Sequence, residues 1–230
     1  MIVRCHQLKA FMTEPKTKED REKGLLSETT KKLIADIFLF DKFGYKEPLI
    51  TDPIMKGLYS EQESLKLVQK VLKGQFRAKN TEVFKNDIIS GTPDVVIDLI
   101  EDIKTSYTLS SYFNTKESKS DYYWQMQGYM WLTGKKNARV IHTLLPSSEE
   151  AIMNEKKKFF YKFNQQSDHP EYIKISQQIE HNNKVILTIP DNKRVKVIDI
   201  PFDPNTPELI KSRWEKAKVL YDSLMKEWEI

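Results

Sequence analysis

The most informative stretch of the sequence spans residues 91–106: Gly91-Thr92-Pro93-Asp94-Val95-Val96-Ile97-Asp98-Leu99-Ile100-Glu101-Asp102-Ile103-Lys104-Thr105-Ser106. A Gly-Thr-Pro turn and Asp94 come first, and the apolar run that follows contains Asp102 and Lys104. Side chains two residues apart on a strand point to the same face, so we expect Asp102 and Lys104 to project into a cleft while Ile103 points into the core. A strand pair bent back on itself would bring Asp94 beside Asp102. Because unpaired charge is costly to bury, these groups indicate a functional site.

The charged groups of this stretch suit a divalent metal ion. Carboxylates and water molecules provide the octahedral oxygen ligation that Mg²⁺ prefers. A metal held by Asp94 and Asp102 would lower the pKa of a bound water and stabilise charge on a phosphate. Lys104 would then position or deprotonate the attacking water. The alternative is a buried structural ion pair between Asp102 and Lys104.

The spacing acid-x-Lys is weak evidence alone, because the chain is 30% charged. Its other copies lie in polar surroundings, and only the copy at 102–104 lies in an apolar, strand-like run preceded by Pro-Asp. This arrangement resembles the core of the PD-(D/E)xK nuclease superfamily. The resemblance implies an α/β fold of three layers, α/β/α, with a small central mixed sheet flanked by helices, the restriction-endonuclease-like core.

A second motif lies at residues 121–134, where the pattern predicts an amphipathic helix that ends at Gly134. Gln125 and Tyr129 are four residues apart and therefore share a face of this helix. A glutamine among aromatic residues needs a polar partner. The segment resembles the phage-type exonucleases, the lambda exonuclease and YqaJ-like group, in these residues: Gln125, Gln127, Met130-Trp131, Thr133 and Lys136-Asn137-Ala138. The resemblance implies an active-site role for Gln125, which would position the attacking water or the phosphate.

A third motif precedes the apolar strand, where residues 56–68 are predicted to begin a long helix. In the phage-type exonucleases, a Gly-x-x-x-Glu on the helix before the catalytic sheet supplies another acid, and Glu61 matches that spacing from Gly57. Glu63, two residues on, points to a different side of the helix and is the second candidate for this acid. Taken singly, both are ordinary surface glutamates.

The resemblance implies these ligands for Mg²⁺, with Mn²⁺ as a substitute: Asp94, Asp102, the main-chain carbonyl of Ile103, and Glu61 directly or through water. Residues 95–101 contain no Gly or Asn, so the position of the hairpin turn stays open. Asp98 and Glu101 therefore remain possible further ligands.

The remaining chain is predicted to be scaffold. We expect helices near residues 28–42, 149–165, 170–181 and 207–227. We expect strands at 139–145, 184–190 and 194–200, the last two joined by a turn at Asp191-Asn192.

The chain of 230 residues fits a single nuclease domain, residues 1–230. It carries a net charge of +4, which is modest, so any DNA contact depends on local basic patches. The single cysteine, Cys5, excludes an internal disulfide and a four-cysteine iron–sulfur site. No apolar run approaches the roughly 20 residues needed to span a bilayer, and the first residues lack the apolar region of a signal peptide. We therefore expect a cytoplasmic protein without membrane association, in a bacterial host cell if it is phage-encoded.

The function that the resemblance implies is that of a Mg²⁺-dependent deoxyribonuclease, an exonuclease that hydrolyses phosphodiester bonds from the ends of linear double-stranded DNA in phage-type recombination. The expected partners are double-stranded DNA with a free end, a single-strand annealing protein and, as a ring-shaped trimer, further copies of the chain. Two alternatives stay open. One is a sequence- or structure-specific endonuclease of the same superfamily, and the other is a catalytically silent DNA-binding module that kept the fold.

Overall fold

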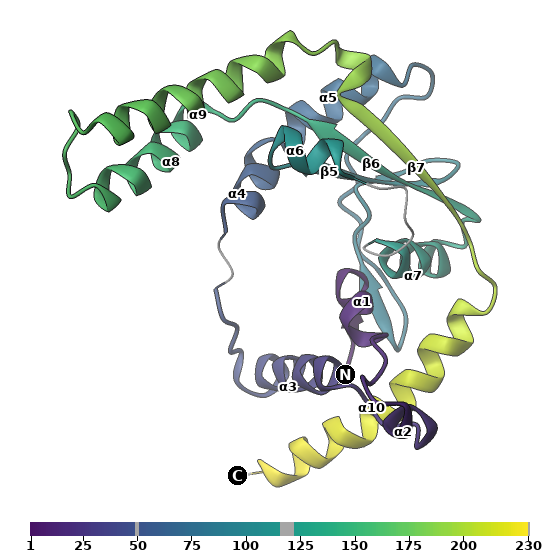
Figure 1. Ribbon diagram of the computed structural model, residues 1–230. Coiled ribbons are helices and arrows are strands. Elements are labelled where there is room, and N and C mark those ends of the chain that lie inside the picture. The colour runs from purple at the N-terminus through teal and green to yellow at the C-terminus, as the bar shows by residue number, and fades with distance from the viewer. Residues whose placement is uncertain (49–50, 116–121, 230) are drawn as a thin grey trace.

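The computed structural model describes residues 1–48, 51–115 and 122–229 (Figure 1). Its elements, in chain order, are β1 (Val3–Arg4), η1 (Cys5–Gln7), α1 (Leu8–Phe11), α2 (Lys18–Glu22), α3 (Glu28–Phe43), α4 (Asp52–Tyr59), α5 (Glu61–Val71), β2 (Phe84–Lys85), β3 (Ile89–Gly91), β4 (Val95–Val96), β5 (Ile100–Ser106), α6 (Leu109–Phe113), α7 (Tyr123–Thr133), β6 (Asn137–Leu144), α8 (Glu149–Lys162), α9 (Pro170–Thr188), η2 (Asp191–Lys193), β7 (Val195–Pro201) and α10 (Thr206–Glu227).

The centre of the fold is a mixed sheet of four strands in the order β4-β5-β6-β7. β5 and β6 run parallel, whereas β4 and β7 pair antiparallel at the two edges. A second small sheet, β1-β3-β2, adds a parallel and an antiparallel pair from the N-terminal part of the chain. The sequence predicted one sheet only, because two-residue strands such as β1 and β2 are too short to show a period.

Helices cover both faces of the four-stranded sheet, α5 on one side and α7 on the other (Figure 1). On the first face, the Ser64 hydroxyl of α5 lies 2.7 Å from the hydroxyl of Thr105 in β5. On the second, the Gln125 amide of α7 donates to Asp102 of the same strand at 3.2 Å. Residues 102 and 105 point to opposite faces because side chains alternate along a strand. The structure therefore confirms the predicted three-layer α/β fold.

The ends of the helices follow their capping residues. Ser27 accepts a hydrogen bond from Thr30 N at 3.0 Å at the start of α3, and Ser148 accepts one from Ala151 N at 3.2 Å at the start of α8. The left-handed glycines Gly44 and Gly134 end α3 and α7. The predicted start of the glutamine helix at Asp121 lies outside the described residues.

Two predictions about the scaffold are wrong. Residues 56–68 do not form one helix, since Ser60 interrupts the segment between α4 and α5. Residues 184–190 are not a strand, because α9 continues to Thr188. Ile179 and Ile186 are seven residues apart, a helical spacing that places both on the side of α9 that lines a cavity. The strand predicted at 194–200 is confirmed as β7, and no helix in the described ranges is long and apolar enough to cross a membrane.

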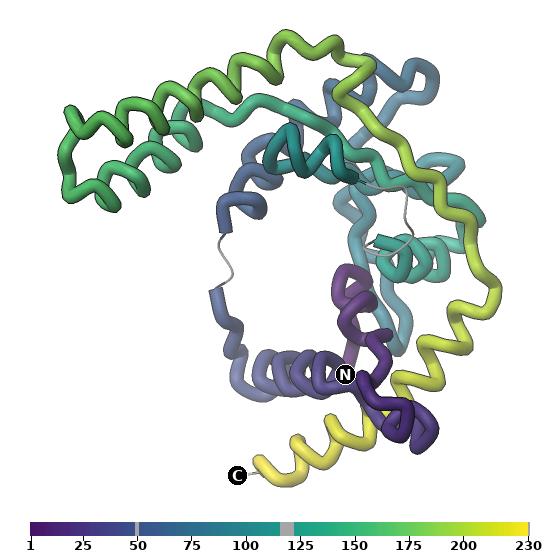
Figure 2. Tube along the Cα trace, viewed as in Figure 1, coloured from purple at the N-terminus to yellow at the C-terminus, as the bar shows by residue number. Residues whose placement is uncertain are grey.

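The main core joins the two ends of the chain. It contains Leu8 and Phe11 of α1, Ile34 of α3, and Ile210 and Tyr221 of α10. Figure 2 follows the trace of α3 and α10, which come from distant parts of the sequence and pack against each other. The first and last helices therefore enclose the side of the sheet that α7 covers.

The contact between η1, β3 and α7 is very close. A methyl group at Gly91 would lie 2.5 Å from Tyr129 Cε1 and 2.8 Å from Cys5 Sγ. One at Gly128 would lie 2.5 Å from Leu8 Cδ1. Burial raises the pKa of the Cys5 thiol to about 12, so this cysteine packs as an inert side chain.

Replacing Gly91 with alanine should lower the free energy of unfolding by about 1–3 kcal/mol, because the added methyl group has no room. The matched control is Gly57→Ala on helix α4, where a methyl group meets nothing within 4 Å. That change should raise the free energy of unfolding by up to about 1 kcal/mol through helix propensity. Chemical denaturation of both variants checks the pair, and equal effects would contradict the packing described for Gly91.

Candidate active site

A tight hairpin brings the two motif aspartates together. β4 pairs with β5 in the register Val95 to Glu101 and Val96 to Ile100, and this register, extended by one residue, sets Asp94 opposite Asp102, whose charge acts on it. The chain reverses over three residues, where Ile97 N donates to Leu99 O at 3.0 Å. The turn therefore forms without glycine or asparagine, and the expected pairing of the two carboxylates is found.

Asp94 is held at the edge of strand β5. Its Oδ2 accepts a hydrogen bond from Ile103 N at 2.7 Å. Burial, and secondarily the charge of Asp102, raise the pKa of Asp94 to about 6, although the Ile103 N–H and Lys104 act in the opposite direction. A cation bound beside Asp94 would favour the ionised form of this carboxyl.

Asp102 is the most enclosed acid of the site, with 2% of its surface exposed. Its Oδ1 accepts from Gln125 Nε2 at 3.2 Å, and its Oδ2 lies 2.7 Å from Lys104 Nζ. The Lys104 contact is an ion pair without hydrogen-bond geometry, so Oδ2 is left without a hydrogen-bond partner among the described residues. A buried carboxylate oxygen that has an ion pair but no hydrogen bond is suited to bind a cation.

Lys104 lies on the same face of β5 as Asp102, as the strand period predicted. Its ammonium also lies 5.1 Å from the centroid of the Tyr122 ring. Burial is the largest single influence and lowers the pKa of Lys104, but the neighbouring acids, Asp102 first and then Asp94, together outweigh it and leave the pKa above its ordinary value. While Asp102 is paired with it, Lys104 therefore remains an ammonium and a donor.

Gln125 has the polar partners that its aromatic surroundings require. Besides Asp102, its Nε2 donates to the Tyr129 hydroxyl at 3.0 Å, and that hydroxyl donates to Thr92 O at 3.3 Å. Burial raises the pKa of Tyr129, so the phenol stays neutral. Tyr129 links the glutamine to the turn before Asp94, a role that the sequence signalled only through its spacing of four from Gln125.

Glu61 begins α5 and faces a cavity of about 310 Å³ together with Asp94 and Ile103. Its Oε1 lies 2.5 Å from the ammonium of Lys79, which lines the same cavity. Ile103 is half-buried and lines this cavity, so the expectation that it points into the core is wrong. Since the N–H and C=O of one strand residue point to the same side, its carbonyl points toward the edge where its N–H meets Asp94.

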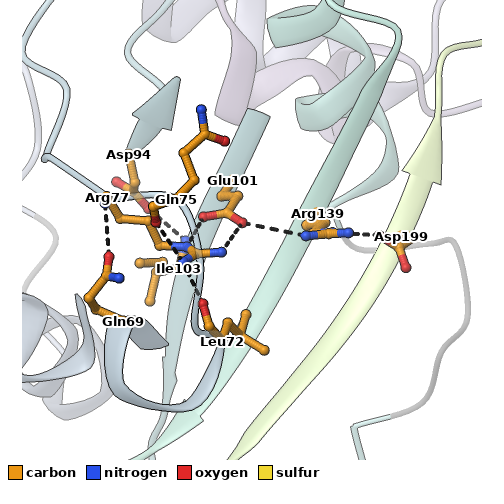
Figure 3. Close-up of polar contacts among 9 residues, drawn as sticks. All are labelled: Gln69, Leu72, Gln75, Arg77, Asp94, Glu101, Ile103, Arg139 and Asp199. Carbon is orange, nitrogen blue, oxygen red and sulfur yellow. Dashed lines mark hydrogen bonds and ion pairs between the residues drawn. The ribbon is translucent and has the colours of Figure 1, made fainter. Parts of the chain in front are cut away.

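Glu101 and Asp98 do not join the two aspartates. Glu101 points to the opposite face from Asp102, is fully buried, and forms two contacts with the Arg77 guanidinium (Figure 3). Asp98 is exposed in the hairpin turn. Glu63 and Glu61 both lie in the first turn of α5, but only Glu61 lines the cavity.

The donors around the hairpin are chemically suited to a divalent metal ion. The described part of the chain contains no group of three or more His, Cys, Asp or Glu side chains already arranged to hold one. Lys104 lies against Asp102, and Lys79 against Glu61. Yet Asp102 Oδ2 has no hydrogen-bond partner among the described residues, and burial and the charge of Asp102 raise the pKa of Asp94, as expected for two neighbouring ligand carboxylates without their cation. The residues present fit the ion.

No protein-family model and no curated protein matches the chain. Among solved structures, it is similar to a phage-related exonuclease from Haemophilus somnus 129PT, with a TM-score of 0.78 and 28% identity over 100% of this chain and 97% of that one. It is also similar to the alkaline exonuclease LHK-Exo from Laribacter hongkongensis, with a TM-score of 0.62 and 13% identity over 98% of this chain and 92% of that one. A structure of LHK-Exo in complex with dAMP gives a TM-score of 0.63. The chain is therefore a structural relative of the phage-type exonucleases of the PD-(D/E)xK nuclease superfamily.

Proposed function

We propose that the protein is a metal-dependent exonuclease that hydrolyses phosphodiester bonds from the ends of linear double-stranded DNA. The observation that carries the proposal is the placement of Asp94 opposite Asp102, with Lys104 and Gln125 both on the Asp102 carboxylate. The likeness to a phage-related exonuclease over the whole chain supports the reaction class. LHK-Exo in complex with dAMP, a deoxynucleoside monophosphate, supports DNA as the substrate.

Mg²⁺ is the proposed cofactor, with Mn²⁺ as a substitute. Asp94, Asp102 and the Ile103 carbonyl would hold it, and Glu61 would add a ligand directly or through water. When bound, the ion supplies a Lewis acid that lowers the pKa of water and stabilises negative charge on the phosphate.

The side chains of the protein contribute positioning and charge. Lys104 carries an ammonium that stabilises the phosphate and orients the attacking water, and its raised pKa keeps it protonated until its partner carboxylate is engaged elsewhere. Gln125 fixes the orientation of Asp102 through Oδ1, while Oδ2, which contacts the Lys104 ammonium, is the oxygen that would bind the metal ion. Tyr129 keeps the Gln125 amide in place. Each group is held by a neighbour on a strand or helix, which is the preorganisation that phosphoryl transfer needs.

The proposal is tested by digesting linear and closed-circular duplex DNA in Mg²⁺, with Lys104→Ala and EDTA as negative controls. Loss of linear DNA alone, abolished by both controls, is the expected result. Lys218→Ala is the matched lysine control, because this residue pairs with Asp222 on α10 and should leave the rate unchanged.

Other results of the digestion experiment would support one of the two alternative functions. Cutting of circular DNA would make the protein an endonuclease of the same superfamily. Absence of cleavage in both Mg²⁺ and Mn²⁺, with DNA binding retained, would make it a silent binding module. The proposed roles beside a single-strand annealing protein and in a homotrimer are tested separately, by co-purification with that protein and by light scattering.

A further inference from the structure

A segment between α5 and β2 crosses the edge of the sheet next to the candidate active site. We call this segment, residues 72–82, the strap. It has no helix or strand of its own, so side-chain contacts must hold its path. Two residues make most of these contacts: Arg77 in the middle and Asn80 near the end.

Arg77 carries a charge although it is only 6% exposed. Its charged groups are therefore bound by neighbouring residues. Its Nε lies 2.6 Å from Glu101 Oε2, and its Nη2 lies 3.1 Å from Glu101 Oε1. Its Nη1 donates to Leu72 O at 2.8 Å and to Gln75 O at 3.2 Å, both in the strap, and its main-chain N–H donates to Gln69 Oε1 at 2.8 Å (Figure 3). One planar guanidinium thus joins the strap to strand β5.

The Arg77 contact continues across the sheet. Glu101, Arg139 and Asp199 stand directly opposite one another on β5, β6 and β7. Arg139 Nη1 lies 3.8 Å from Glu101 Oε1, and Arg139 Nε donates to Asp199 Oδ1 at 2.8 Å (Figure 3). The carboxylate that Arg77 binds therefore belongs to a row of charged side chains that runs across β5, β6 and β7.

The far end of the strap is hydrogen-bonded to the chain that leads into the β4–β5 hairpin. Asn80 N donates to Asp94 O at 2.7 Å, and Asn80 Nδ2 donates to Pro93 O at 3.0 Å. One residue earlier, Lys79 places its ammonium against Glu61. A shift of the strap would therefore move both the main chain of Asp94 and the Lys79 ammonium that lies beside Glu61.

Stability alone does not account for a buried pair of this kind. Taking both charges out of water is costly, and replacing such a pair with apolar side chains of similar volume is often neutral or stabilising. What apolar side chains cannot reproduce is the fixed geometry between one carboxylate and two main-chain carbonyls of the strap.

We propose that Arg77 is a positioning residue: through Glu101 it fixes the strap against β5, so that Asn80 holds Asp94 opposite Asp102 and Lys79 stands at Glu61. The proposal rests on the proposed nuclease function for its kinetic consequence only. Its structural consequence, the ordering of the strap, can be measured in the absence of any substrate or metal.

The test compares three variants: Arg77→Lys, Arg77→Met and the double variant Arg77→Met/Glu101→Leu. Arg77→Lys keeps the charge, but its ammonium has three donors on one nitrogen and cannot replace the four contacts of the planar guanidinium, so we expect a 10–100-fold loss of nuclease rate. Hydrogen exchange at the amide of Asn80 should accelerate as well. Arg77→Met should unfold at a clearly lower denaturant concentration, because it removes the guanidinium that pairs with the buried carboxylate of Glu101. The double variant should recover most of that stability but neither the rate nor the protection of Asn80.

Arg213→Lys is the matched control, since Arg213 donates to Thr13 O at 3.0 Å on a remote part of the fold. It should leave the rate and the exchange of Asn80 unchanged. The proposal would be overturned if the double variant recovered both the nuclease rate and the protection of Asn80, or if Arg77→Lys kept wild-type values of both. Arg77 and Glu101 would then contribute only to packing. If the wild-type protein cleaves no DNA, the proposed function fails, and exchange at Asn80 still decides the role of Arg77.

Discussion

Replacing Asp102 with asparagine is expected to reduce DNA hydrolysis by on the order of a thousandfold while leaving the protein folded. Asparagine has nearly the same shape, and its amide oxygen still accepts from Gln125 Nε2. What is lost is the negative charge that pairs with Lys104 and that would bind the metal. Initial rates on linear duplex DNA measure the loss, and circular dichroism with thermal unfolding checks the fold.

The same hairpin provides the control for this prediction. Asp98 is exposed in the turn, two residues after the end of β4, and is not part of the site. Asp98→Asn removes the same charge and should keep the wild-type rate. Calorimetry adds a second measurement, because Mg²⁺ binding should disappear in Asp102→Asn and persist in Asp98→Asn. Full activity of Asp102→Asn would contradict the assignment of the site.

Replacing Asp94 with asparagine should have opposite effects on activity and stability. Hydrolysis should be lost for the reason given for Asp102, but the metal-free protein should become more stable at pH 8. The physical cause is the raised pKa of about 6, which means that the folded state resists ionisation of this carboxyl. The expected gain is about 2 kcal/mol, somewhat below the full value of such a shift because the carboxyl is only partly shielded from solvent.

The size of this effect changes with pH in a defined window. At low pH, Asp94 is neutral in both the folded and the unfolded chain, and asparagine brings no gain. As the pH rises from the ordinary aspartate value of 3.8 to about 6, the unfolded chain ionises first, so the wild-type protein loses stability relative to the variant. Above that window the difference is constant. Urea denaturation in EDTA at pH 3.5, 5 and 8 measures it, and a variant that is less stable at every pH would contradict the electrostatic cause.

The chemistry on strand β5 could be predicted because it depends on short-range rules. The period of two places Asp102 and Lys104 on one face, and the helical spacing places Gln125 and Tyr129 together on α7. The pairing of Asp94 with Asp102 required a hairpin, which any short connection between the two strands would supply. Each of these relations joins residues that are close together in the sequence.

The parts that could not be predicted depend on partners far apart in the sequence. Arg77 and Glu101 are separated by 24 positions, and Arg77 lies in no motif. Ile103 lines a cavity rather than the core because α5 leaves that part of the face uncovered near Glu61. Residues 184–190 are apolar enough for a strand or a buried helix, and only their packing in α9 decides between the two.

The contact between α3 and α10 has a consequence for how the protein is made. The main core contains Leu8 and Phe11 from one end of the chain and Ile210 and Tyr221 from the other. During synthesis, the apolar side of α1 and α3 stays exposed until α10 has left the ribosome, because its covering helix is translated last. We therefore expect chains that stop before residue 206 to remain aggregation-prone although they contain every proposed catalytic residue. Attachment to the ribosome should delay folding of the nuclease core until translation has passed that helix.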